Sequence, residues 1–276
     1  MAPVSSFILH PSSFEFLLLR ILDAVILAGG AMPPSLVPVT SVSERALIEI
    51  EGQTLLSRVV DSLRETPAVT RIICVATPEA LLSLDSDVIG LPAGDKMTQN
   101  LLLGARAAHS ERILIVTADA PLVTGQTWTQ FLHGATAQSL EAAYPIVRRQ
   151  AVEAQFPGGK RTYARLKDGV FTGGNAFLLP KDRLEALETV IERAFAARKN
   201  PLALARMLGA GFIVRFATRR LTVREIEAKI SSLLGCRGGA VVVGDASIAF
   251  DVDKPADLVA ARAELEKRAR EQRKIG

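Results

Sequence analysis

The 276-residue sequence predicts an α/β fold in which a mostly parallel sheet is covered by helices. Strand-like apolar runs alternate with segments whose apolar residues recur at helical spacing, which is typical of a parallel sheet with crossover helices. Hydrophobic residues make up 49% of the chain and charged residues 22%, as in globular proteins that bury a core. We find no repeat of roughly 20 to 50 residues and no low-complexity linker, which favours one elaborated domain over 21–276.

The amino-terminal half supplies most of the expected sheet. The first strand is an apolar run that ends at Gly29, and the helix after it carries apolar residues at helical spacing behind Gly52. Runs rich in β-branched residues, such as "RIICVAT", predict the next strands. In chain order we expect a strand at 23–28, a helix at 53–65, strands at 71–77 and 88–89, a helix at 98–109, and strands at 112–119 and 141–147.

The rest of the chain departs from this simple alternation. The polar stretch 148–169 predicts two extended arms around Pro157, outside the main sheet, before 170–179 returns to the core. Residues 181–235 predict a helical insertion with one apolar break at 212–216, and its apolar residues suit a lid, a homodimer interface or packing on the sheet. We expect insertion helices at 181–197, 201–209 and 222–235, closing strands in "GAVVVGD" and "SIAFDVD", and a last helix from Pro255.

Charge, hydropathy and cysteine usage limit the kinds of partner and compartment. The formal net charge of +4 comes from scattered basic residues, except in the carboxyl-terminal helix, so we expect no nucleic-acid partner. Glu15, Arg20 and Asp23 interrupt the first apolar stretch, which makes it too short and too charged to span a membrane. The two cysteines form no CxxC pattern and suit reduced thiols in a cytoplasmic protein. Residues 1–20 fit no element and are expected to be a disordered or mis-assigned extension.

The loop after the first strand has the composition of a phosphate-binding turn. Gly29 and Gly30 follow a buried apolar run, and such glycine turns bring backbone N–H groups close to phosphates. Pro33 and Pro34 stand where a third glycine and a basic residue are often found. The loop therefore predicts nucleotide binding through the backbone, with positive charge supplied from elsewhere.

Acidic residues end two of the expected strands. Asp119 ends "ILIVTAD", and Asp251 and Asp253 end "IAFDVD". Open α/β sheets bind ligands at the carboxyl ends of their strands. Carboxylates that meet there suit Mg²⁺, which binds one or two protein carboxylates and completes its shell with phosphate and water. The alternative interpretation is that each Asp near a proline caps a turn or a helix.

Four motifs in this order resemble those of the MobA-like and sugar-phosphate nucleotidyltransferases: "DAVILAGG", "RALIEIEGQTLLSRVVDSL", "TADAPLVT" and "FDVDKPADLVAARA". The resemblance covers residues 23–180 and 240–265, and the stretch 181–235 is not part of the common pattern. It implies the GT-A fold, a three-layer Rossmann-like architecture. It also implies transfer of a nucleotidyl group from an NTP to a phosphate-bearing acceptor, with release of pyrophosphate.

The resemblance also implies roles for individual residues. Residues of the first loop would place backbone amides against the NTP, and a helix start would contact the base or ribose. Two carboxylates would bind Mg²⁺, and a turn after a later strand would meet the acceptor, although that turn equally suits a purely structural role. The implied positions are Leu27, Ala28, Gly29, Gly30, Gly94 and Asn100 for the nucleotide, Asp119 and Asp253 for the metal, and Gly174 and Asn175 for the acceptor.

The sequence departs from the family where the family carries its charged groups. The usual loop LAGGxGxR is followed by a lysine, whereas here the loop has no such arginine and Arg45 stands at the lysine position. Fixed cations stabilise the charge that develops on phosphoryl oxygens. Lys160 and Arg161, on the arm after Pro157, are the best additional source of charge, and the alternative is that both are solvated loop cations. We therefore predict catalytic roles for Arg45, Lys160 and Arg161.

The leading prediction is a Mg²⁺-dependent nucleotidyltransferase that acts on a small phosphorylated acceptor, such as a sugar phosphate, a polyol phosphate or a cofactor precursor. The first alternative is a glycosyltransferase of the same fold, because metal-bound aspartates also hold nucleotide-sugars. The second is a regulatory protein that binds nucleotide with weak or no turnover, because the first loop has lost its charged groups. Release of pyrophosphate from an NTP distinguishes the three.

Overall fold

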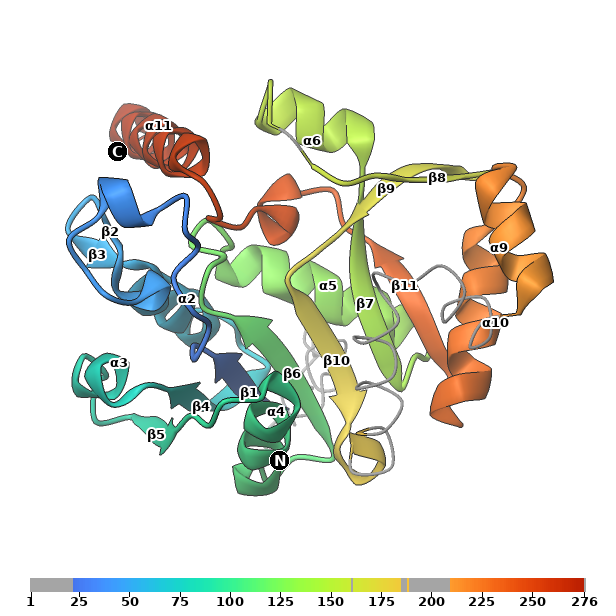
Figure 1. Ribbon diagram of the computed structural model, residues 1–276, viewed down its shortest axis with the longest axis horizontal. Coiled ribbons are helices and arrows are strands. Elements are labelled where there is room, and N and C mark those ends of the chain that lie inside the picture. The colour runs from blue at the N-terminus through green and yellow to red at the C-terminus, as the bar shows by residue number, and fades with distance from the viewer. Residues whose placement is uncertain (1–21, 160, 185–187, 189–208, 276) are drawn as a thin grey trace, which may run out of the picture.

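The computed structural model describes residues 22–159, 161–184, 188 and 209–275 (Figure 1). The predicted extension at 1–20, the side chain of Lys160, and most of the helices expected at 181–197 and 201–209 lie outside these described residues. Within them, one large sheet lies between helices on its two faces (Figure 1). The predicted α/β class is confirmed.

The central sheet is parallel where the first half of the chain builds it. Its strand order is β5-β4-β1-β6-β10-β7-β9-β8, and β11 pairs with β7. The first four strands in this order are mutually parallel, whereas β10 runs antiparallel to β6. The strands are β1 (Leu22–Leu27), β4 (Val69–Ala76), β5 (Val88–Pro92), β6 (Arg112–Thr117), β7 (Ala142–Arg148), β8 (Ala164–Leu166), β9 (Gly169–Gly173), β10 (Ala176–Pro180) and β11 (Gly238–Val242).

Successive side chains along β1 pack against opposite helical layers. Ala24 and Ile26 belong to a core that includes residues of α2 (Leu55–Arg64) and α5 (Gly125–Ala137). Val25 belongs to the core on the other face, where Leu101 and Ala105 of α4 (Met97–Ala107) cover the sheet. A strand buried on both faces is apolar at consecutive positions, which explains the continuous apolar run in the sequence. The predicted three-layer arrangement is therefore confirmed.

Gly104 allows α4 to lie close against the sheet. A Cβ atom on Gly104 would lie 2.4 Å from Val25 Cγ1, and Val25 is fully buried. We expect Gly104→Ala to lower the free energy of unfolding by about 1–3 kcal/mol, the usual cost of overpacking a core. Gly211 in α9 (Ala210–Ala217) provides the control, because a Cβ there meets nothing within 4 Å. In urea denaturation Gly211→Ala should be neutral or stabilising, and an equal result for Gly104→Ala would contradict the close packing.

The segment expected as two extended arms adopts a different structure. Residues 148–169 begin with the helix α6 (Arg149–Gln155), and the second arm forms β8, which joins the main sheet through β9. Val152 and Phe156 are both buried and lie one helical turn apart, so α6 has an apolar side. The prediction was wrong because helix-forming polar residues surround a single apolar pair, and so short a pattern indicates no clear period.

The described part of the insertion predicted over 181–235 is largely helical: residues 181–184 and 188 are helical, where a helix was expected at 181–197, and the helices α9 and α10 (Val223–Leu234) follow. The expectation of a break at 212–216 was wrong, because these residues lie within α9, where Phe212 and Phe216 are one helical turn apart. The helix α10 agrees with the helix expected at 222–235. It starts at a capping box, in which Thr222 and Glu225 exchange hydrogen bonds between side chain and backbone.

The stretch "SIAFDVD" was expected to be a closing strand and is not one. It forms the 3₁₀ helix η3 (Ala246–Ala249) followed by a loop. The Asp245 carboxylate accepts a hydrogen bond from the Ser247 amide, and this bond starts the turn. The final helix, α11 (Pro255–Ile275), begins at Pro255 as predicted, with the Asp257 carboxylate accepting from the Lys254 amide at 2.9 Å.

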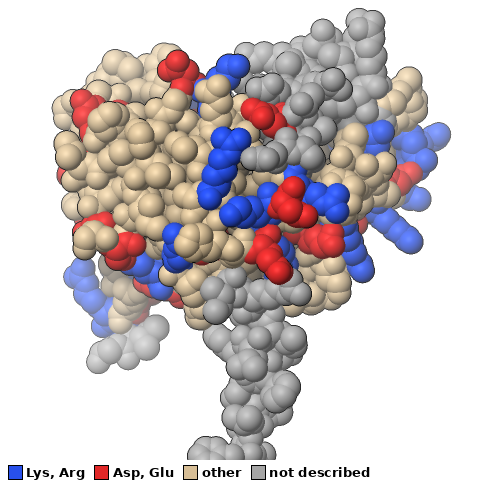
Figure 2. Space-filling model, turned by 90° about the horizontal axis from the view of Figure 1, so that it is seen from below, with Lys and Arg blue, Asp and Glu red and all other residues tan. Residues whose placement is uncertain are grey.

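The remaining elements are short. They are β2 (Glu49–Ile50), β3 (Gln53–Thr54), α3 (Pro78–Leu82) and the 3₁₀ turns η1 (Val37–Val39) and η2 (Arg45–Leu47). Among the described residues, no helix has both the length and the apolar character needed to cross a membrane. On the face seen in Figure 2, Lys and Arg side chains are interspersed with Asp and Glu side chains.

Candidate active site

The carboxyl ends of β1 and β6 meet at one edge of the sheet. β1 lies between β4 and β6 and is parallel to both. The chain passes from β1 to β4 on one side and later to β6 on the other, which makes this edge a topological switch point, where open sheets bind ligands. The glycine pair follows β1 after Ala28, and Asp119 lies just beyond β6. The fold therefore brings the predicted nucleotide loop and the predicted metal ligand together.

The glycine turn lies close to its neighbours. A Cβ atom on Gly29 would lie 2.8 Å from Ala93 Cβ, and one on Gly30 would lie 3.2 Å from Arg45 Nη2. Among the described residues, none accepts a backbone hydrogen bond from the Gly29 or Gly30 amide. Small residues are needed here for space, and their amides are left to bind a ligand.

Two of the four residues predicted to bind the NTP, Leu27 and Ala28, pair with neighbouring strands. Leu27 is the last residue of β1 and pairs with Val75 and Thr117. The Ala28 amide donates to Val75 O at 2.9 Å, so it is not free to bind a phosphate. The part of the loop with free amides is therefore Gly29 and Gly30.

Asn100 and Gly94 are joined to each other. Asn100, near the start of α4, is buried, accepts a hydrogen bond from Gly94 N at 2.7 Å and donates one to Gly94 O at 3.0 Å. Its Nδ2 also lies 3.3 Å from the place of a Cβ on Gly29. Asn100 thus supports the loop beside the glycine turn, and a direct contact with a base or ribose stays a prediction.

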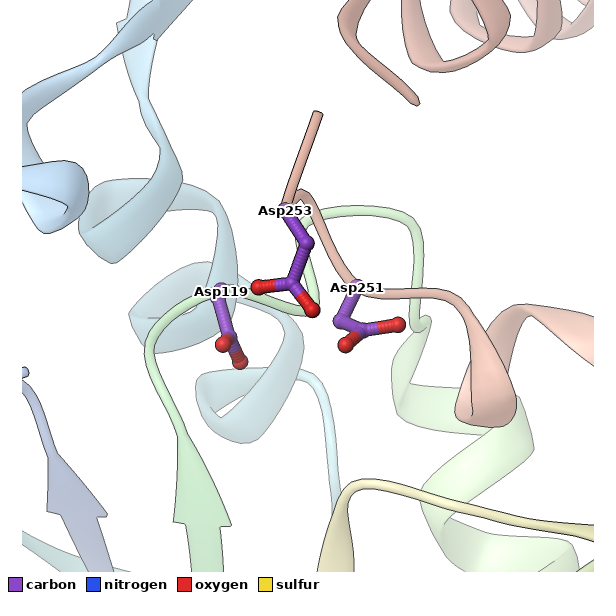
Figure 3. Close-up of side chains that lie close together, drawn as sticks. All are labelled: Asp119, Asp251 and Asp253. Carbon is purple, nitrogen blue, oxygen red and sulfur yellow. The ribbon is translucent and has the colours of Figure 1, made fainter. Parts of the chain in front are cut away.

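Three carboxylates converge at this edge of the sheet (Figure 3). Asp119, Asp251 and Asp253 each offer one oxygen, and these oxygens all lie within 4.8 Å of one another. The Val252 amide donates to Asp119 O at 3.0 Å, which ties the loop after η3 to the segment after β6. Asp251 was not among the predicted metal ligands, although the alternating Asp-Val-Asp pattern, with Val252 buried between, was the available signal.

Arg45 bridges two of these carboxylates. Its Nη1 lies 2.7 Å from Asp119 Oδ2 and 2.6 Å from Asp253 Oδ1. The Arg45 side chain is 21% exposed and that of Asp119 10%, so water screens this ion pair only in part, whereas the Asp253 side chain is 49% exposed. Because Nη2 lies beside Gly30, one guanidinium contacts both the acidic cluster and the glycine turn.

Arg161 lies on the third carboxylate. It forms an ion pair with Asp251 and stacks over the Phe250 ring, 4.9 Å from the ring centroid. Burial lowers the pKa of Arg161 from its ordinary value, yet a guanidinium stays charged at neutral pH. The alternative interpretation of Arg161 as a solvated loop cation is therefore wrong, whereas Lys160 lies outside the described residues.

Gly174 and Asn175 lie between β9 and β10, on the other side of β6 from the glycine turn. Their amides donate to Pro145 O at 2.9 Å and Ile248 O at 2.8 Å. Asn175 Nδ2 is buried and has no hydrogen-bond partner among the described residues, as is also true of Thr117 Oγ1 at the end of β6. Buried polar atoms without partners suit a place that a ligand completes. The sequence did not single out Thr117.

Comparison with known proteins identifies the family of the chain. A family model described as the MobA-like NTP transferase domain matches residues 24–208. The chain belongs to this family. It is thus a nucleotidyltransferase, as the four sequence motifs implied, and the MobA-like match ends before the loop that carries Asp251 and Asp253. No curated protein matches the chain.

Solved structures share the fold of this MobA-like transferase. A hypothetical transferase from Thermus thermophilus is 32% identical, with a TM-score of 0.76, over 87% of this chain and 100% of its own. The 2-C-methyl-D-erythritol 4-phosphate cytidylyltransferase from Thermus thermophilus is 17% identical, with a TM-score of 0.53, over 88% of this chain and 98% of its own. A CMP:2-keto-3-deoxy-manno-octonic acid synthetase complexed with CTP is 14% identical, with a TM-score of 0.55, over 90% of this chain and 100% of its own. The last two likenesses show the fold alone.

Proposed function

We propose that this transferase moves a nucleoside monophosphate group from an NTP to a small phosphorylated acceptor, in a Mg²⁺-dependent reaction that releases pyrophosphate. The observation that carries the proposal is the convergence of three carboxylates and a glycine turn at the switch point of the sheet. Arg45 joins the two parts, since its guanidinium touches Asp119 and Asp253 and also lies beside Gly30.

The residues of the acidic cluster fit a magnesium ion. Asp119 Oδ1 is buried and has no hydrogen-bond partner among the described residues, so its lone pairs are available to a ligand. Carboxylate oxygens are the ligands that Mg²⁺ prefers, and Asp119, Asp251 and Asp253 would hold it. When bound, the ion supplies charge neutralisation at the phosphates and at the leaving pyrophosphate.

The chain's own residues bind and orient the triphosphate. The Gly29 and Gly30 amides donate to phosphate oxygens, as in other backbone anion sites. Arg45 and Arg161, with Lys160, stabilise the negative charge that develops on the α-phosphoryl group. An oxygen of the acceptor phosphate attacks the α-phosphorus in line, a new P–O bond forms, and the bond to pyrophosphate breaks. No side chain serves as a nucleophile, so positioning and electrostatics supply the rate.

The acceptor is proposed to bind across β6 from the NTP, at Gly174 and Asn175. The unpartnered Nδ2 of Asn175 and Oγ1 of Thr117 support this place, because a phosphate or hydroxyl oxygen would satisfy both. The helices of the insertion are proposed to form a lid or a homodimer interface. In α9, Val214 is 60% exposed and Phe216 44% exposed, which supports either role.

The test is a direct measurement of pyrophosphate. Each of the four NTPs is incubated with Mg²⁺ and a panel of sugar and polyol phosphates. CTP comes first, because one structural neighbour is a cytidylyltransferase and another is complexed with CTP. We expect pyrophosphate with one NTP and one class of acceptor, after a thermal-shift screen has shown which NTP stabilises the protein. Consumption of a nucleotide-sugar without pyrophosphate would support the glycosyltransferase alternative. NTP binding without any turnover would support the regulatory alternative and contradict this proposal.

A further inference from the structure

Arg45 occupies the place of a cation in the acidic cluster. A single nitrogen, Nη1, lies 2.7 Å from Asp119 Oδ2 and 2.6 Å from Asp253 Oδ1. Arg161 takes up the third carboxylate, Asp251. The three carboxylates and two guanidinium groups together carry one net negative charge. The cluster is therefore nearly neutral with its arginines in place, and it attracts a further cation only weakly.

A divalent cation and Arg45 compete for the same two carboxylates. An ion held by both Asp119 and Asp253 would be close to Arg45 Nη1, which already contacts both side chains, and two positive groups so close together repel each other. Arg161 is held by a second contact besides its ion pair, because its guanidinium stacks on the Phe250 ring. Among the described residues, Arg45 is thus the cation that must move before the ion can bind both carboxylates.

We propose that Arg45 is a displaceable counter-ion, so that it and the metal exclude each other from Asp119 and Asp253. This inference rests on the metal site of the proposed function. The released guanidinium has only a short way to move, because Nη2 already lies beside Gly30, 3.2 Å from the place of a Cβ atom. Phosphates at the glycine turn would then receive it. The cluster should therefore bind metal weakly without nucleotide and tightly with NTP. Only the triphosphate offers the Arg45 guanidinium new anionic partners in place of the carboxylates.

The experiment measures Mn²⁺ binding without nucleotide, by electron paramagnetic resonance of the free ion and by calorimetry. Mn²⁺ stands in for Mg²⁺ because it also prefers oxygen ligands. Arg45→Gln should bind Mn²⁺ roughly tenfold more tightly than the wild type, since the competing group is gone. Arg45→Lys, which keeps the charge but reaches two carboxylates less well, should lie between them.

Lys254→Gln is the matched control for the loss of one positive charge. Lys254 is exposed and follows Asp253 directly, but no ion pair joins its side chain to the cluster among the described pairs. Its Mn²⁺ affinity should stay within about twofold of the wild type, because a charge in water is strongly screened. A gain as large as that of Arg45→Gln would show a general field effect and overturn the exclusion.

A second readout reports on Arg45 itself. The ¹⁵Nε–H signal of its guanidinium, assigned by its absence in Arg45→Gln, should change when Mg²⁺ and an unreactive NTP analogue are added to the wild type. An unchanged signal with the ligands bound would overturn the proposal. Equal Mn²⁺ affinity of wild type and Arg45→Gln would also overturn it while leaving the metal site intact. Absence of binding to either protein would reject the proposed metal site itself, and this inference with it.

Discussion

Replacing Asp119 by asparagine should lower the rate of nucleotidyl transfer by about a thousandfold, the upper range for removing one group that stabilises a transition state. Asparagine keeps the size of the side chain but removes the charge that would hold the ion. The buried Oδ1, which has no partner among the described residues, is the oxygen proposed to bind the ion, and a neutral carboxamide would bind it far more weakly. NTP affinity should also become insensitive to EDTA. Pyrophosphate release and calorimetry with and without EDTA measure the two effects.

Asp182→Asn is the control for Asp119→Asn. Its side chain is 76% exposed, and it follows β10, which runs antiparallel to β6, so it lies at the opposite edge of the sheet. This variant should keep wild-type turnover and its dependence on Mg²⁺. Equal NTP affinity of the wild type with and without EDTA would show that the acidic cluster holds no functional metal.

Replacing Arg45 by alanine should reduce pyrophosphate release by about a hundredfold, as expected for the loss of one group that stabilises developing charge. NTP affinity should fall less than the rate, because the contact strengthens in the transition state. The variant should also bind free Mn²⁺ more tightly. Slower turnover combined with tighter metal binding distinguishes a displaced counter-ion from a residue that merely supports the fold.

Arg45→Lys separates the charge from the guanidinium shape. It restores the residue usual in the family and should retain or raise activity. If the wild type and both Arg45 variants all bind NTP yet release no pyrophosphate across the acceptor panel, the catalytic role is wrong. The chain would then be a nucleotide-binding regulator. Thermal denaturation of each variant shows whether a lost activity reflects a lost fold.

Sequence patterns predicted the fold well where a single physical requirement dominated. β1 and the second half of β4 are buried on both faces, so most of their residues are apolar, and such runs are easy to interpret. The segment 148–169 did not have to be apolar throughout. In and next to α6, only Val152 and Phe156 are buried among the described residues. Apolar and polar residues alternate in "SIAFDVD" as in a strand. The hydrogen bond from the Ser247 amide to the Asp245 carboxylate instead starts a 3₁₀ turn at the beginning of this stretch.

The candidate site was predictable in its parts but not in its connections. The glycine turn and Asp119 were visible because each follows an expected strand, and parallel strands end at one edge of a sheet. Asp251 was visible as part of a pattern but was not assigned to the metal. Thr117 was not visible, because a threonine at the end of a strand has no distinctive sequence signal.

The sequence by itself determined the fold class, the family and the residue types available for chemistry, because local burial patterns and short motifs carry that information. Only the tertiary structure decided which charges meet. Arg45 and Asp253 are 208 positions apart in the chain, and no local pattern relates them. They touch because the strand order brings the loops after β1, β6 and η3 to one edge, where partial burial makes unpaired charges costly and draws the guanidinium onto the carboxylates.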